Sequence, residues 1–296
     1  KKLGWSGYVI DAAIVTHPDD DHIGGFVHIL EDLQAGKLYD ICFNCFWVND
    51  PTKHEFVPND VQRIQTQKSL DARLKCVYNY KEDSKKNLLD LIDSAGIART
   101  EVFAGDYLDE PQITIISPTR DFYESLLPKF RNKLNFHWAL EALEENSYSS
   151  KDDISDETTL SKTLDDATDD TSAHNQSSIV FLLETDEKQK FLFTGDAGRD
   201  AFNHVPQTLL GKVKDVTWMK VPHHGSKHNL DSTIIKHVNP EIAYISTEKQ
   251  GKYLNRSTVF ALKKNGTKVY STSQNRSTIR HGAIKTREGW TKIEPM

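Results

Sequence analysis

Thr16-His17-Pro18-Asp19-Asp20-Asp21-His22-Ile23-Gly24-Gly25 is the most informative segment of this chain. Within six of its residues it holds four potential metal ligands: His17, Asp19, Asp21 and His22. The apolar run at 8–16 reads as a buried strand, and the apolar spacing at 23–34 predicts a helix. A loop between a strand end and a helix start can direct several side chains toward one point. Imidazole and carboxylate together suit a divalent cation such as Zn²⁺ or Mn²⁺.

A second interpretation makes this segment a solvated acidic turn, with Asp21 as the cap of the following helix. A cap needs one carboxylate, whereas the segment holds three carboxylates and two histidines. The sequence therefore favours a metal site.

The overall composition is that of a polar globular protein. The 296 residues can bury a sizeable core, with 37% hydrophobic residues and a mean hydropathy of −0.58. No apolar run approaches the length that a bilayer requires, and no signal peptide is visible. The three cysteines, Cys42, Cys45 and Cys76, are too few for a disulfide framework. We expect a cytoplasmic protein with no membrane partner.

The acidic residues of the chain are concentrated in one segment. Residues 144–170 hold ten acids and two lysines, a net charge of −8, whereas the whole chain carries −6. The rest of the chain is therefore close to neutral, and its charge does not exclude an anionic substrate. The acidic segment is rich in Ser, Thr and Asp and lacks apolar periodicity. We therefore expect residues 146–172 to form an acidic, mobile insertion in a single domain, 1–296.

Strand and helix patterns alternate along the chain, which predicts a layered α/β fold. A helix is expected at 84–95, with Ser84 as its N-cap and Gly96 as its stop. Two apolar runs joined by the polar turn 186–188 predict a hairpin. The strands expected after residue 100 are 112–117, 178–184, 190–194, 213–221, 241–246, 268–271, 278–284 and 290–293.

Three later segments place further potential ligands beside strands. His174 comes before the strand at 178–184, Asp196 follows the strand at 190–194, and His223-His224-Gly225-Ser226 follows the strand at 213–221. Each could be ordinary alone: a surface histidine, a helix cap or a polar strand end. Together they suggest that side chains gather at one edge of a sheet, where α/β proteins keep their sites.

The order of these motifs resembles the metallo-β-lactamase superfamily, and most closely the β-lactamase-like domain of competence DNA-uptake channel proteins. The motifs that carry the resemblance are residues 16–25, Phe193-Thr194-Gly195-Asp196 and Pro222-His223-His224-Gly225-Ser226. The resemblance implies an αββα sandwich. It also implies strands upstream of the first motif, which we expect to be short, missing or supplied by another chain.

Two further positions differ from the general pattern. Most superfamily members have histidine where this chain has Asp19; the competence branch shares the aspartate, a harder ligand that favours Mn²⁺. That branch usually has a His-Pro near Asn255-Arg256, which this chain lacks.

The resemblance also implies a pair of divalent metal ions, Zn²⁺ or Mn²⁺, that activates a water for hydrolysis. One ion would be held by His17, Asp19 and His174. The other would be held by Asp21, His22 and either His223 or His224, with Asp196 bridging the two. Alignment of the His-Gly-Ser motif favours His224 as the ligand, which leaves His223 to contact substrate or move a proton. We expect catalytic roles for Asp21, Asp196 and His223.

The expected reaction is hydrolysis of a phosphodiester in a nucleic acid or nucleotide. Ser226, Lys227 and His228 lie beside the predicted site and could bind phosphate, although a solvated loop explains Lys227 and His228 equally well. Two alternatives stay open. One is a hydrolase of a non-phosphate ester or lactam, and the other is a metal-stabilised interaction subunit that binds a partner protein chain.

Overall fold

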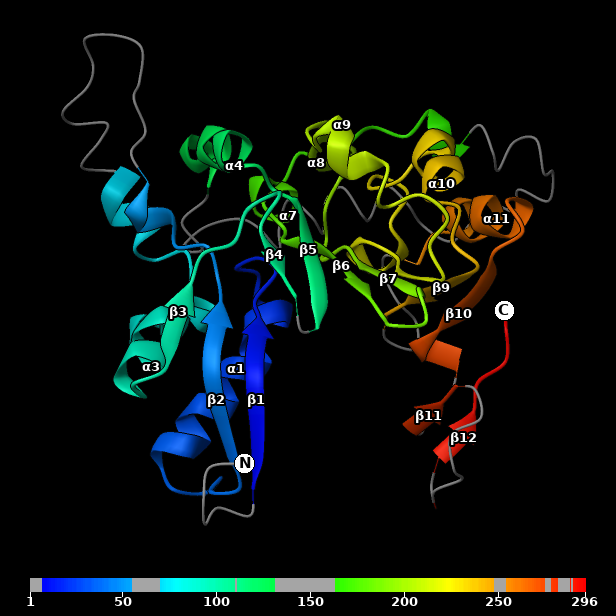
Figure 1. The fold of residues 1–296 in the computed structure, drawn as a ribbon. Coiled ribbons are helices and arrows are strands. Elements are labelled where there is room, and N and C mark those ends of the chain that lie inside the picture. Colours follow the sequence, from blue (N-terminus) through cyan, green and yellow to red (C-terminus); the bar gives the residue numbers. More distant parts are fainter. Residues whose placement is uncertain are drawn as a thin grey trace, which may run out of the picture. The chain divides into compact units, whose positions relative to one another are not determined.

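The computed structural model describes residues 7–54, 70–109, 111–130, 163–247, 254–274, 278–281, 288 and 290–296. The chain divides into two compact units (Figure 1). The first unit comprises Lys1–Phe103 and Thr119–Leu143, and the second comprises Ala104–Pro118 and Glu144–Met296. Both units contain sheets and helices, so the protein is of mixed α/β class, as expected.

The first unit is built on a three-stranded parallel sheet in the order β1-β2-β3. Apolar residues of α1 and α3, among them Ile23, Leu30 and Ile92, are fully buried. Backbone pairing continues one residue past β1, where the amide of Val15 donates to the carbonyl of Trp47. The backbone just before Thr16 is therefore fixed to β2. The elements of this unit are β1 (Tyr8–Ile14), α1 (Asp20–Gln34), β2 (Ile41–Trp47), η1 (Pro51–Lys53), η2 (Tyr80–Glu82), η3 (Ser84–Lys86), α3 (Leu88–Ser94), β3 (Ala98–Thr100), α4 (Arg120–Leu126) and η4 (Leu127–Lys129).

The helix expected at 84–95 is shorter than the sequence indicated, because its cap lies elsewhere. Ser84 begins the 3-10 turn η3, and α3 begins after Asn87, whose side chain accepts from the amides of Leu89 and Asp90. Gly96 follows the helix with φ +68, a conformation that glycine adopts without strain, so the expected stop is confirmed.

The second unit is built on a seven-stranded mixed sheet in the order β10-β9-β8-β7-β6-β5-β4. The expected hairpin is confirmed, since β6 and β7 pair antiparallel around the turn at 186–188. Its strands are β4 (Tyr107–Leu108), β5 (Gln112–Ser117), β6 (Val180–Glu184), β7 (Lys190–Phe193), β8 (Trp218–Lys220), β9 (Ile242–Ile245) and β10 (Lys268–Ser271). A separate pair is formed by β11 (Thr278–Arg280) and β12 (Trp290–Lys292).

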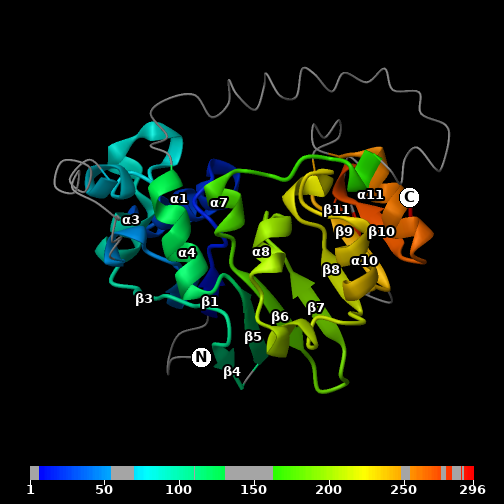
Figure 2. The same ribbon diagram turned by 90° about the horizontal axis from the view of Figure 1, so that it is seen from above.

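Helices cover one face of this sheet (Figures 1 and 2). One residue from each of the strands β6 to β10 pairs with its neighbour across the sheet, and together these residues form a fully buried apolar row, namely Leu182, Leu192, Met219, Ala243 and Val269. The helical elements of this unit are α7 (Ala173–Gln176), α8 (Arg199–Asn203), α9 (Gln207–Leu210), η5 (His223–Gly225), α10 (Ser232–Val238), α11 (Arg256–Lys264) and η6 (Thr272–Gln274).

The direction of the strands gathers three motifs at one edge of this sheet. Because β6 runs antiparallel to β7, and β7 parallel to β8, the start of β6 lies on the same side as the ends of β7 and β8. The segments that hold His174, Asp196 and His223 adjoin these three strand ends.

Part of the predicted acidic insertion, residues 146–162, lies outside the described residues. Residues 163–172 contact the body of the second unit. Leu164 is fully buried, and the carbonyls of Leu164 and Ala167 accept hydrogen bonds from the guanidinium of Arg199. Within the portion of the chain that the structure describes, no helix has the length and apolar character needed to cross a membrane.

Candidate functional site

The first unit presents its histidines and aspartates where the chain leaves β1 and enters α1. Asp19 is the N-cap residue of α1, with φ −71 and ψ 149, but its side chain makes no capping hydrogen bond. Its carboxylate lies instead 3.7 Å from Nε2 of His17. Asp21 is inside the first turn of the helix, so it is not the cap that the alternative interpretation required.

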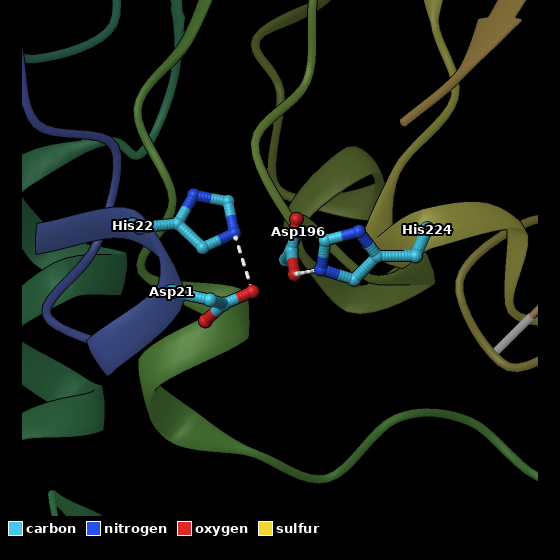
Figure 3. Close-up of side chains that lie close together, drawn as sticks. All are labelled: Asp21, His22, Asp196 and His224. Atoms are coloured by element: carbon cyan, nitrogen blue, oxygen red, sulfur yellow. Dashed lines mark ion pairs between the residues drawn. The ribbon is translucent and has the colours of Figure 1, made fainter. Parts of the chain in front are cut away.

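The hydroxyl of Thr16 orients both imidazoles of this segment. Its Oγ1 lies 3.1 Å from Nδ1 of His17 and 3.2 Å from Nδ1 of His22. The two rings are adjacent, with centroids 4.1 Å apart. Since Nδ1 of each ring faces the hydroxyl, Nε2 is the nitrogen that faces away from it. Nε2 of His22 lies 3.5 Å from a carboxylate oxygen of Asp21 (Figure 3).

The second unit holds a comparable pair at the ends of β7 and β8. Asp196 is 3% exposed, and its amide donates to the hydroxyl of Ser178. Nδ1 of His224 is 2.6 Å from the carbonyl oxygen of Ser246, which fixes Nδ1 as the protonated nitrogen. Nε2 of His224 therefore faces Asp196, at 3.7 Å from its Oδ2 (Figure 3).

Lys220 supplies a positive charge to Asp196. Its ammonium lies 3.0 Å from Oδ1 of the carboxylate and also donates to the carbonyl of Gly195. One carboxylate oxygen of Asp196 thus contacts Lys220 and the other faces His224. The pairing of Lys220 with Asp196 joins the end of β8 to the residues that follow β7, so no local sequence pattern reveals it.

The backbone that carries His224 is strained. His223 and His224 adopt φ of 44° and 54°, and Gly225 follows with φ 90°. Left-handed non-glycine residues each cost about 1–3 kcal/mol and persist only where their surroundings hold them. Here the amide of Ser226 donates to the carbonyl of His223, and the amide of Asn255 donates to that of Gly225.

His223 points into a buried polar network. Its Nδ1 lies 3.2 Å from Oδ2 of Asp170 and 3.1 Å from Oδ1 of Asn229. Burial alone would lower the pKa of His223, but the hydrogen bond that the ring donates to Asp170 and the charges of Asp196 and Asp170 outweigh it and raise the pKa to about 9. Burial acts to raise the pKa of Asp170, and its bonds with His223, Asn175 and Ser172 hold it below its ordinary value.

Asp170 and Asn229 are the residues of this region that the sequence did not single out. Asp170 belongs to an acidic run that resembles a solvated segment, and Asn229 lies in a loop without a motif. Their contacts join positions far apart in the chain, so no local pattern reveals them.

The predicted substrate-binding residues have structural partners. Ser226 is buried, and its hydroxyl accepts from the amide of His228. The ring of His228 donates from Nδ1 to the carbonyl of Thr168 at 2.7 Å, and the carbonyl of Lys227 accepts from Arg199. The loop that carries these three residues is therefore anchored to residues 163–170, and a role in substrate binding stays a prediction.

His and Asp side chains that could hold a metal ion occur in both units: Asp21 and His22 in the first, Asp196 and His224 in the second. The buried His17 and His174, and Asp19, were predicted as ligands too, but are not in this set. The number and kind of ions stay predictions.

Comparison with known proteins gives one distant relative. ComE operon protein 3 of Bacillus subtilis (strain 168) is 30% identical over 128 residues. The match covers 43% of this chain and 16% of that protein, so the chain spans a minor part of its relative. No family model matches the sequence, and no solved structure matches the chain.

Proposed function

We propose that this protein is a metal-dependent hydrolase of the metallo-β-lactamase type that cleaves phosphodiester bonds in a nucleic acid or nucleotide. The observation that carries the proposal is the same in both units. A histidine is held at Nδ1 by an oxygen and directs Nε2 toward a carboxylate: His22 with Asp21, and His224 with Asp196. Histidines that ligate metals are held in this way.

The donor set fits a borderline divalent cation. Imidazole nitrogen and carboxylate oxygen suit Zn²⁺ or Mn²⁺, and each unit offers one donor of each kind: His22 and Asp21 in the first, His224 and Asp196 in the second. The proposal extends the role of metal ligand to His17 and Asp19 of the first unit and to His174 of the second. When bound, the ions would lower the pKa of water and stabilise negative charge on the substrate.

Residues of the chain itself would prepare the site for an anion. The ammonium of Lys220 is fixed beside Asp196, so it adds positive charge without further ordering. The ring of His223, which follows β8 three residues after Lys220, is held by Asp170. Both features suit a phosphodiester, whose negative charge must be accommodated.

The relative favours DNA uptake as the process in which this activity takes part. It is named ComE operon protein 3, and the motifs quoted from the sequence resemble those of competence DNA-uptake channel proteins. We therefore propose a function related to DNA uptake, with DNA as the first substrate to test.

The test is hydrolysis of bis-p-nitrophenyl phosphate and single-stranded DNA with added Mn²⁺ or Zn²⁺. We expect turnover by the wild type, and a loss of about 100-fold or more in His22→Ala and in Asp196→Asn. His28→Ala is the matched control, since His28 is an exposed histidine of the same helix.

Equal turnover by the wild type and the Asp196→Asn variant would contradict the proposal. Faster cleavage of a thioester or lactam probe would keep the hydrolase and change the bond. A wild type that binds metal, cleaves no probe and co-purifies with another chain would favour the interaction subunit.

A further inference from the structure

The carboxylate of Asp170 contacts the ring of His223 and accepts hydrogen bonds from three further residues. Its Oδ2 lies 3.2 Å from Nδ1 of His223 and accepts from Nδ2 of Asn175 at 2.8 Å and of Asn229 at 2.9 Å. Its Oδ1 accepts from the amide of Ser172 at 2.8 Å. Because these partners approach from several directions, the carboxylate has one position available to it.

The two asparagines of this network are almost completely buried. Asn175 is 2% exposed and Asn229 is 0% exposed. Asn229 also donates to the carbonyl of Asp196, so one side chain connects Asp170 with the backbone of the candidate site. Loss of the carboxylate would leave buried donors without an acceptor, which is costly.

Arg199 ties the Asp170 segment to the loop that carries His223. The guanidinium is buried and lies 3.0 Å from a carboxylate oxygen of Asp169. It donates to carbonyl oxygens on both sides, those of Leu164, Ala167, Lys227 and Leu230. The amide of Asp170 in turn donates to the carbonyl of His228 at 3.1 Å. The segment and the loop are therefore held together independently of the Asp170–His223 contact.

We propose that Asp170 is a positioning residue that holds Nδ1 of His223 and so directs Nε2 of that ring away from the buried network, toward the substrate. The holding of Nδ1 concerns this chain alone, whereas the orientation toward substrate rests on the proposed function. Orienting partners of this kind support imidazoles that contact a substrate or move a proton. The left-handed backbone of His223 has the same explanation, since a strained residue needs a surrounding structure that fixes it.

The first test is nuclear magnetic resonance of the metal-free protein with ¹⁵N-labelled histidine. We expect a slowly exchanging, downfield proton on Nδ1 of His223, assigned by its loss in His223→Gln. This resonance should vanish in Asp170→Asn and persist in Asp166→Asn, which removes an exposed carboxylate of the same segment. Persistence in Asp170→Asn would overturn the proposal. So would its absence from the wild type, a result that needs no variant to fold.

The second test separates positioning from a structural role. With the phosphodiester probe, we expect Asp170→Asn to lower kcat by about 10–100-fold with little change in KM. In a His223→Gln background the same substitution should lower kcat no further. A further loss there, or a change in KM alone, would contradict a role through His223. If the wild type cleaves nothing, the proposed function fails, and the Nδ1 resonance still decides the positioning.

Discussion

The side chain of His54, in the first unit, contacts two carboxylates at once. Its Nε2 and Nδ1 each lie 2.9 Å from an oxygen, of Glu101 and Glu124 respectively, and its side chain is 1% exposed. Burial acts to lower the pKa of His54, but the hydrogen bonds and charges of the two carboxylates outweigh it and raise the pKa above 6.5. Burial acts to raise the pKa of Glu101, and its bond with His54 holds it below 4.5.

These shifts predict how the stability of the first unit depends on pH. A raised histidine pKa adds stability that is complete below 6.5 and is lost as the pH rises through the folded value. A lowered glutamate pKa adds stability that is complete above 4.5 and is lost as the pH falls through the folded value. The contribution of this cluster to the free energy of unfolding should therefore be greatest between these two limits.

Denaturant unfolding across pH, in the wild type and in His54→Gln, measures this contribution. We expect the variant to lose about 1–3 kcal/mol between pH 4.5 and 6.5 and less at high pH. A difference between the two proteins that grows above pH 6.5 would contradict the assignment.

The sequence indicated which individual residues are candidates for the site, but not which of their side chains contact one another. Of the His and Asp residues of the 16–25 segment, Asp21 and His22 are among the side chains that could hold a metal ion, and the roles of His17 and Asp19 stay predictions. The pairing of Lys220 with Asp196, and of Asp170 with His223, depends on which strands and loops become neighbours. No residue pattern in the sequence carries that information.

The helix α1 contains a natural pair for a test at the scale of elements. Gly24 and Gly25 are adjacent in the helix, but a Cβ on Gly24 would lie 2.7 Å from the Tyr80 ring, whereas a Cβ on Gly25 would meet nothing within 4 Å. The close approach of Tyr80, not backbone conformation, is what requires glycine at 24. Alanine is favoured over glycine in a helix by about 1 kcal/mol.

We expect Gly25→Ala to raise the free energy of unfolding by up to about 1 kcal/mol. Gly24→Ala should lower it, because displacing the Tyr80 ring costs about 1–3 kcal/mol, which exceeds the gain in helix propensity. Denaturant midpoints of the two variants give the comparison. Equal stabilisation by both substitutions would show that the packing of Tyr80 on α1 is unimportant.

The apolar patterns predicted the long elements well and the short ones poorly. β1, α1 and the β6–β7 hairpin lie where expected, because each presents a clear periodicity. The strand expected at 213–221 is reduced to Trp218–Lys220, because residues 211–213 form a turn and Asp215 adopts a positive φ of 51°. Two short helices have too few residues to show a helical period: α7, which carries His174, and α8, which follows Asp196.

For the whole molecule, the sequence predicted the α/β class, and the structure shows how the chain distributes the motifs. The first motif lies in one compact unit, and the other motifs lie in the second. The two sets of motifs are therefore far apart in the sequence and also belong to separate sheets. The αββα sandwich stays part of the proposal.

The most direct test of the central claim is the metal-to-protein ratio of the full chain, by elemental analysis after loading with Zn²⁺ or Mn²⁺ and removal of free ions. We expect about two ions per chain, and a lower ratio when a ligand is removed from either unit, by Asp21→Ala or by Asp196→Ala. A wild type with less than one ion per chain, or variants that keep the full ratio, would contradict it.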